Sequence, residues 1–153
     1  MYIVLIDEGY EDRVFTEQGL AKAFLTRPTI SVFANVGMFL EEYERLPKPF
    51  ILILELILPL FAVQREEDDL IRRVEKLKTR FPWLGDDWEG LRGGEVLIRG
   101  IRSIQDDLPI IIYTDIDSEE ISPDILELSE FRFCEKQVEI RNLVETIRSF
   151  GIA

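Results

Sequence analysis

The chain has 153 residues, 46% of them hydrophobic, and a formal net charge of −12. This composition predicts one globular domain over residues 1–153 and excludes a disordered chain. The negative charge disfavours nucleic acids and anionic membrane surfaces as partners. One cysteine and no histidine exclude an intrachain disulfide and histidine-based catalysis, and we expect a cytoplasmic protein.

Apolar runs and amphipathic segments alternate along the chain. In chain order, they predict a strand at 2–6, a helix at 12–25, a strand at 29–34, a helix at 35–45, a strand at 50–58, helices at 66–81 and 94–104, a strand at 108–113, a helix at 118–130, a strand at 131–134 and a helix at 138–150. Such alternation implies right-handed crossovers and a parallel α/β sheet with helices on both faces.

The stretch from Phe50 to Pro59 is the centre of this pattern. Its aliphatic residues do not alternate with polar ones, which is typical of a strand buried on both faces. Glu55 lies at its downstream end, where a buried carboxylate needs a cationic partner. The apolar segment 50–63 is too short to span a bilayer.

Polar side chains follow four of the predicted strands. Asp7 and Glu8 follow the first strand, Glu55 the third, Thr114 the fourth and Lys136 the fifth. Ligands of open α/β sheets gather at the carboxyl ends of the strands. We therefore expect three carboxylates, a hydroxyl and an ammonium group at one edge of the sheet.

In these residues the sequence resembles the receiver domain of two-component response regulators, which are CheY-like domains. That family has an acidic pair after strand 1, a phosphoacceptor Asp after strand 3, Thr or Ser after strand 4 and Lys after strand 5. Pro59 and Phe133 also match, as the Pro after the acceptor and the aromatic switch residue on strand 5. The resemblance implies the flavodoxin-like strand order 2-1-3-4-5 and a signalling role without enzymatic activity.

Glu55 stands where the family has the acceptor Asp. Its carboxylate is one methylene further out, and misplacement by about 1 Å can slow in-line attack roughly a hundredfold. We expect that Glu55 is not phosphorylated in the usual way and is either an ionised stand-in for the phosphorylated acceptor or a structural partner of Lys136. Phosphorylation of Glu55 in a phosphorelay is the alternative.

Two further departures affect the expected pocket. Gln137 replaces the cis-proline that usually follows the Lys, and Asp115 replaces a small residue after Thr114. The resemblance implies an Mg²⁺ site on Asp7, Glu8 and Glu55, because carboxylate oxygens suit that ion. A Glu55–Lys136 ion pair would compete with Mg²⁺, so both outcomes stay open.

A segment of about thirty residues, 60–90, has no counterpart in the family. It carries an extra helix and the tryptophans Trp83 and Trp88. These aromatics either pack the extra helix onto the domain or form an interface for a partner, since Trp is common in interface hot spots.

We expect a stand-alone receiver, with no output domain after residue 153, that binds a sensor kinase or an output protein. The segment 121–150 corresponds to the family's usual interaction and dimerisation face. A second class of function is a Toprim-like, Mg²⁺-dependent phosphodiester enzyme, as in topoisomerases and primases, because Glu8-Gly9 and Asp115-x-Asp117 follow predicted strands.

Overall fold

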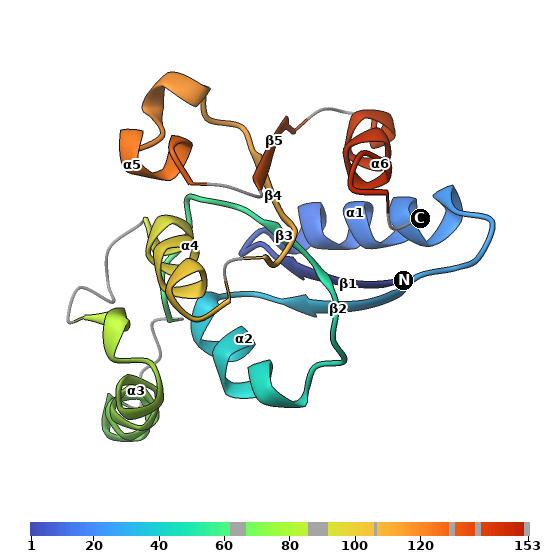
Figure 1. The fold of residues 1–153 in the computed structure, drawn as a ribbon. Helices are drawn as coiled ribbons and strands as arrows, with labels where there is room; N and C mark the ends of the chain where they lie inside the picture. The colour runs from blue at the N-terminus through green and yellow to red at the C-terminus, as the bar shows by residue number, and fades with distance from the viewer. Residues whose placement is uncertain (62–66, 86–91, 106, 129–130, 137–138, 152–153) are drawn as a thin grey trace.

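The computed structural model describes residues 1–61, 67–85, 92–105, 107–128, 131–136 and 139–151. Five parallel strands form one sheet in the order β2-β1-β3-β4-β5 (Figure 1). Their bounds are Tyr2–Ile6 for β1, Thr29–Phe33 for β2, Ile51–Leu54 for β3, Ile110–Thr114 for β4 and Phe131–Glu135 for β5. The predicted strand order 2-1-3-4-5 is confirmed.

Six α-helices are described, and they cover both faces of the sheet. They are α1 Tyr10–Ala23, α2 Val36–Glu42, α3 Glu67–Arg80, α4 Gly93–Ile104, α5 Pro123–Leu126 and α6 Arg141–Arg148, with 3-10 turns η1 Tyr43–Arg45, η2 Pro82–Leu84 and η3 Ser118–Glu120. Asn35 caps the beginning of α2, because its Oδ1 accepts a hydrogen bond from Met38 N at 2.9 Å. Among the described residues, no helix is long and apolar enough to cross a membrane.

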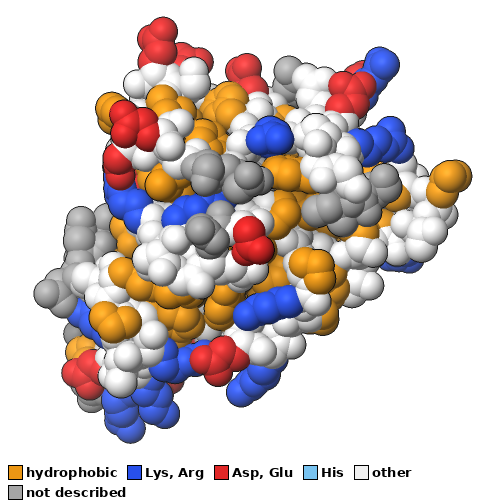
Figure 2. All heavy atoms as spheres, in the orientation of Figure 1, with side chains coloured by type: hydrophobic (Ala, Val, Ile, Leu, Met, Phe, Trp, Pro, Cys, Tyr) orange, Lys and Arg blue, Asp and Glu red, His pale blue; other side chains and the backbone are white. Residues whose placement is uncertain are grey.

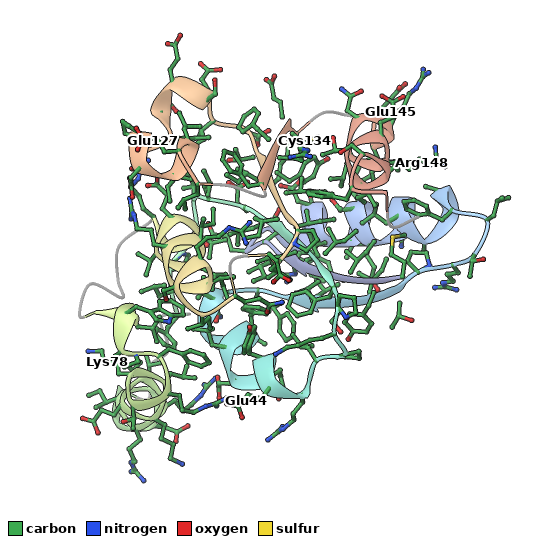
Figure 3. The ribbon with its side chains drawn as sticks, viewed as in Figure 1. Glu44, Lys78, Glu127, Cys134, Glu145 and Arg148 are labelled. Carbon is green, nitrogen blue, oxygen red and sulfur yellow. The ribbon has the colours of Figure 1, made fainter. Side chains whose placement is uncertain are left out.

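Alternate residues of the strands belong to two hydrophobic cores, one on each face of the sheet, as the two-residue period of a strand requires. In β3, Leu52 and Leu54 face the core shared with α2, α3, α4 and α5, whereas Ile51 and Ile53 face the core shared with α1 and α6. Figure 3 shows the side chains that fill both spaces, including Cys134 of β5, which lies in the second core.

Two helices, α3 and α4, connect β3 to β4, as the sequence predicted. Helix α3 extends the first core with Leu70, Val74 and Leu77, and Arg73 on it forms an ion pair with Glu41 of α2. Figure 2 shows Lys and Arg side chains over the part of the surface where α3 lies, at the lower left. The basic residues of α3 therefore form a solvated face of a packed helix.

The predicted helix at 118–130 is wrong over most of its described length. The chain instead forms the turn η3 and, after a break, the four-residue helix α5. Pro123 is the cause, because a proline disfavours the helical conformation for the residue before it. Ser122 accordingly has a non-helical backbone, with φ −56° and ψ 133°. Residues 129–130 lie outside the described residues.

Two other predicted boundaries shift. Strand β3 ends at Leu54, although we predicted a strand to residue 58. Beyond Glu55 the chain turns, with Leu58 N donating to Leu56 O at 3.2 Å, and it meets the beginning of α4. Helix α6 begins at Arg141, later than the predicted residue 138, which itself lies outside the described residues.

Candidate functional site

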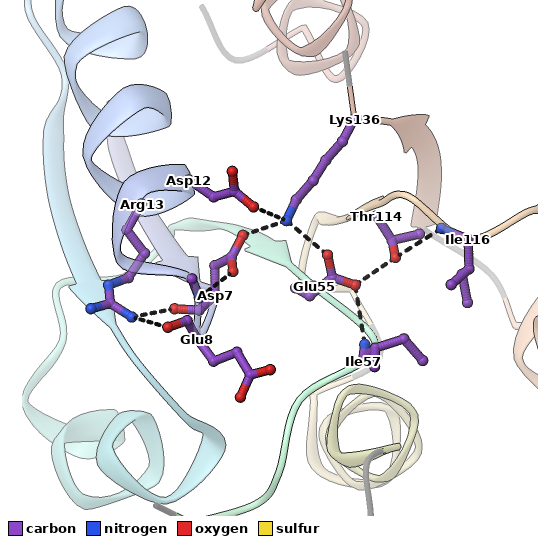
Figure 4. Close-up of polar contacts among 10 residues, drawn as sticks. Asp7, Glu8, Asp12, Arg13, Glu55, Ile57, Thr114, Ile116 and Lys136 are labelled. Carbon is purple, nitrogen blue, oxygen red and sulfur yellow. Dashed lines mark hydrogen bonds and ion pairs between the residues drawn. The ribbon is translucent and has the colours of Figure 1, made fainter. Parts of the chain in front are cut away.

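The polar residues singled out in the sequence line an open hollow of about 330 Å³ at the carboxyl edge of the sheet. It lies where β1, β3 and β4 end, with β5 supplying the last wall. The lining residues are Asp7, Glu8, Gly9, Asp12, Glu55, Ile57, Thr114, Asp115, Ile116 and Lys136. Figure 4 shows the polar contacts among most of them.

Asp7 directly follows β1 and is buried. Its Oδ1 accepts a hydrogen bond from Gly9 N at 2.9 Å, and its Oδ2 accepts one from Lys136 Nζ at 2.6 Å. Arg13, one turn into α1, donates to the carbonyl oxygens of Asp7 and Glu8 at 2.7 and 2.9 Å. These contacts position the loop after β1 so that the Asp7 carboxylate points at Lys136.

Glu55 directly follows β3, and only 7% of the residue is exposed. Its backbone N–H still bonds to Ile6 O at 3.0 Å, so the strand ladder reaches the acid itself. The side-chain Oε1 accepts hydrogen bonds from Thr114 Oγ1 and from Ile57 N, the latter at 3.1 Å. The other oxygen, Oε2, lies 2.8 Å from Lys136 Nζ. Both carboxylate oxygens of Glu55 thus have partners within the chain.

Lys136 joins the acids of two neighbouring strands. Its ammonium group contacts Asp7 and Glu55 and also lies 3.1 Å from Asp12 Oδ2. Backbone pairing sets its position, because Lys136 N donates to Thr114 O at 3.0 Å. The side chain is 11% exposed.

The electrostatic balance at Lys136 favours the charged form. Burial by itself lowers the pKa of its ammonium group, but hydrogen bonds to Asp7 and Glu55, together with their charges, outweigh burial and raise the pKa above its ordinary value. Lys136 is therefore an ammonium ion at any physiological pH, and it compensates the two buried carboxylates.

The arrangement does not fit a resident divalent cation. Mg²⁺ needs oxygen ligands in octahedral geometry at about 2.0–2.1 Å, and here the ammonium group lies between the oxygens of Asp7 and Glu55. Among the described residues, no group of three acidic side chains is arranged to hold a metal ion. Mg²⁺ at this position would have to displace Lys136.

Other predicted site residues lie at the edge of this cluster or away from it. The Glu8 side chain is exposed and points away from Lys136 (Figure 4), and Asp115 is exposed on the rim of the hollow. Phe133 on β5 is half-buried and packs against the first core, and Ile112 is its register partner. Thr114 is fully buried.

Of the two predicted interface residues, the structure describes only Trp83. Trp83 packs on α4, where a Cβ added to Gly100 would lie 2.1 Å from the indole ring, and it contacts Phe81 with ring centroids 5.7 Å apart. These contacts favour the packing interpretation for Trp83. Trp88 and Gln137 lie outside the described residues.

Sequence reasoning missed Asp12 and the amide of Ile57 as members of the site. Asp12 stands in the first turn of α1, and the signal that could have identified it was an acid one turn beyond the Asp7-Glu8 pair. Ile57 contributes only its backbone N–H, and side-chain patterns carry no information about such a donor.

No protein-family model and no curated protein matches the sequence, but solved structures resemble the fold. The response regulator TrrA from Thermotoga maritima, solved in complex with Mg²⁺ and BeF, has a TM-score of 0.65 at 17% identity, and the match covers 97% of this chain and 96% of TrrA. A CheY-like receiver domain protein from Methanospirillum hungatei gives 0.60 at 16%, covering 97% and 91%.

The response regulator StyR matches with a TM-score of 0.63 at 17% identity over 97% of this chain. The chain spans 57% of StyR, a little over half of that protein. At these identities the likeness concerns the fold, and the fold is that of response-regulator receiver domains.

Proposed function

We propose that this chain is a divergent receiver-type signalling module that acts by binding another protein, with a pocket held by an internal ion pair and not by phosphate. The receiver fold supports the signalling role. The observation that carries the rest is the position of Lys136 Nζ, 2.6 Å from Asp7 Oδ2 and 2.8 Å from Glu55 Oε2.

The state of Glu55 supports the absence of conventional phosphorylation. A carboxylate that accepts a phosphoryl group must present a free oxygen in line with the leaving group. Both oxygens of Glu55 are engaged, Oε1 by Thr114 and Ile57 and Oε2 by Lys136. The longer side chain thus occupies space that a shorter acid would leave for phosphate, and it already makes contacts with the hydroxyl and ammonium groups.

The partner we propose is a sensor kinase or an output protein, and the contact face is the segment 121–150, which includes α5, β5 and α6. The alternative partner for this face is a second copy of the chain. Glu127, directly after α5, and Glu145 and Arg148 on α6 stand at the outer surface (Figure 3).

Intact-mass measurement after incubation with acetyl phosphate and Mg²⁺ tests the proposal. We expect no phosphoryl adduct on the wild type. Glu55→Asp is the matched variant, because it withdraws the carboxylate by one methylene and frees space beside Lys136, and we expect it to take up at least some phosphate. An adduct on the wild type that Glu55→Gln abolishes would establish the phosphorelay alternative instead.

Partner binding is the second measurement. Pull-downs with the wild type, Glu55→Asp and Lys136→Met, all without phosphodonor, compare the same bound protein across three pocket states. We expect the wild type to retain the partner and Lys136→Met to retain less of it. Equal recovery of the partner with all three proteins would show that partner binding does not depend on the pocket.

The Toprim-like alternative receives no support from the site geometry. Asp115 and Asp117 are exposed, and the described acids do not combine with Glu8 into a metal-binding group.

A further inference from the structure

A third buried carboxylate, Glu95, lies outside the Lys136 cluster. It stands in the first turn of α4 and is 1% exposed. Arg92 Nε donates to its Oε1, and Ser122 N donates to its Oε2 at 2.9 Å. Burial by itself raises the pKa of Glu95, but the hydrogen bonds from Arg92 and Ser122 lower it below its ordinary value. Glu95 is therefore an ionised group with two partners.

The beginning of α4 is held tightly against the segment that follows Glu55. Gly93 N donates to Leu58 O at 2.8 Å, and Gly94 N donates to Leu56 O at 3.2 Å. A Cβ on Gly94 would lie 2.6 Å from the Glu55 carbonyl oxygen, so only glycine allows this approach. Helix α4 consequently provides a fixed base for Glu95.

The groups that Glu95 and Arg92 hold belong to the segment 118–126. Ser122 is the N-cap residue of α5, and Arg92 Nη2 donates to Glu120 O at 2.8 Å. This segment contains only a 3-10 turn and a four-residue helix, which have few hydrogen bonds of their own. Contacts from α4 are therefore needed to define its conformation.

We propose that Glu95 is a positioning residue that clamps segment 118–126 onto α4 and thereby gives this part of the proposed interaction face one defined conformation. The inference rests on the proposed function only in taking this face as the partner surface. The exposed acids of the segment, Glu119, Glu120 and Asp124, would then be held in a defined arrangement; acidic side chains gather in this region at the upper left of Figure 2.

Hydrogen–deuterium exchange on the full chain tests the clamp with two variants. Glu95→Gln keeps the shape and removes the charge. Ser122→Pro removes the donated N–H with little backbone strain, because Ser122 already has φ −56° and Ile121 has an extended backbone. We expect exchange at the amides of 118–126 to rise roughly tenfold or more in both, as loss of a hydrogen bond to a charged group implies, while the amides of the β-sheet stay protected.

Arg99→Gln is the matched control. It breaks the surface pair in which Arg99 Nε lies 2.6 Å from Asp124 Oδ2, a second tie between α4 and α5 that is exposed to solvent. We expect it to change exchange at 118–126 by less than about twofold. Equal loosening by Arg99→Gln, or unchanged exchange in both Glu95→Gln and Ser122→Pro, would overturn the clamp.

Glu55→Gln separates this inference from the proposed function, because it alters the pocket but leaves both hydrogen bonds to Glu95 in place. We expect exchange at 118–126 to rise by less in Glu55→Gln than in Glu95→Gln, and an equal rise would overturn the clamp, since the pocket would then hold the segment. If the wild type takes up phosphate from acetyl phosphate, the proposed function fails while the exchange results on Glu95 still decide the clamp.

Discussion

Replacement of Lys136 by methionine is the most direct perturbation of the site. Methionine keeps the apolar part of the side chain but leaves the buried acids Asp7 and Glu55 without their cation. Breaking a buried ion pair by removal of one partner costs about 3–5 kcal/mol. The side chains of Lys136, Asp7 and Glu55 are 11%, 6% and 9% exposed, so the pair belongs to this class and not to surface ion pairs.

We expect the lower part of that range, about 3 kcal/mol, for Lys136→Met. The hollow is open to solvent, and each acid keeps a backbone hydrogen bond, from Gly9 N to Asp7 and from Ile57 N to Glu55. These contacts continue to stabilise the carboxylates after the ammonium group is removed.

Urea unfolding followed by circular dichroism at neutral pH measures the loss as a change in the free energy of unfolding. Lys22→Met is the control, because Lys22 is exposed in the last turn of α1 and its loss should fall within about 0.5 kcal/mol. A loss for Lys136→Met no larger than for this control would refute the interpretation of Lys136 as the group that compensates two buried acids.

The effect of divalent cations on stability is a second measurement on Lys136→Met. With the ammonium group absent, millimolar Mg²⁺ should stabilise Lys136→Met, because an ion that binds only the folded chain raises its stability. The wild type should respond little, since Mg²⁺ must first displace Lys136. Equal stabilisation of both proteins would contradict the inferred competition.

Three further predictions concern pH and packing. The pKa of Lys136 is raised in the folded state, so its contribution to the free energy of unfolding is complete below the ordinary pKa of 10.5 and is lost as pH rises through the folded pKa. The decrease in the free energy of unfolding at alkaline pH should therefore be smaller in Lys136→Met than in the wild type. The pKa of Glu95 is lowered, so its contribution to the free energy of unfolding is complete above the ordinary pKa of 4.5 and is lost as pH falls through the folded pKa. In Glu95→Gln the free energy of unfolding should therefore change less with pH below 4.5. An unchanged pH dependence would count against an ionised Glu95. Gly100→Ala should destabilise the chain by about 1–3 kcal/mol, because the new methyl group overlaps the Trp83 ring. In a Trp88→Phe background the fluorescence emission of Trp83 should also shift. Unchanged emission and unchanged stability would contradict the packing of Trp83 on Gly100.

Strands β1, β3 and β4 were predictable because each is an uninterrupted apolar run whose end is marked by a polar residue. Glu55 and Thr114 follow such runs directly, and a parallel sheet brings the carboxyl ends of its strands to one edge. Periodicity predicted the helix at 118–130 wrongly. Ile121 and Ile125 have helical spacing and are both buried, but Pro123 prevents a continuous helix through Ser122.

The sequence by itself determined which charged groups stand at the strand ends and on which strands they stand, because this depends only on the order of residues along the chain. Only the tertiary structure decided that Lys136 contacts Asp7, Asp12 and Glu55 and that Glu8 points elsewhere. The burial of Glu95 against Ser122 was decided there too. The physical reason is that ion pairing and desolvation depend on distances of a few ångströms between residues far apart in the chain, and packing of the helices on the sheet sets those distances.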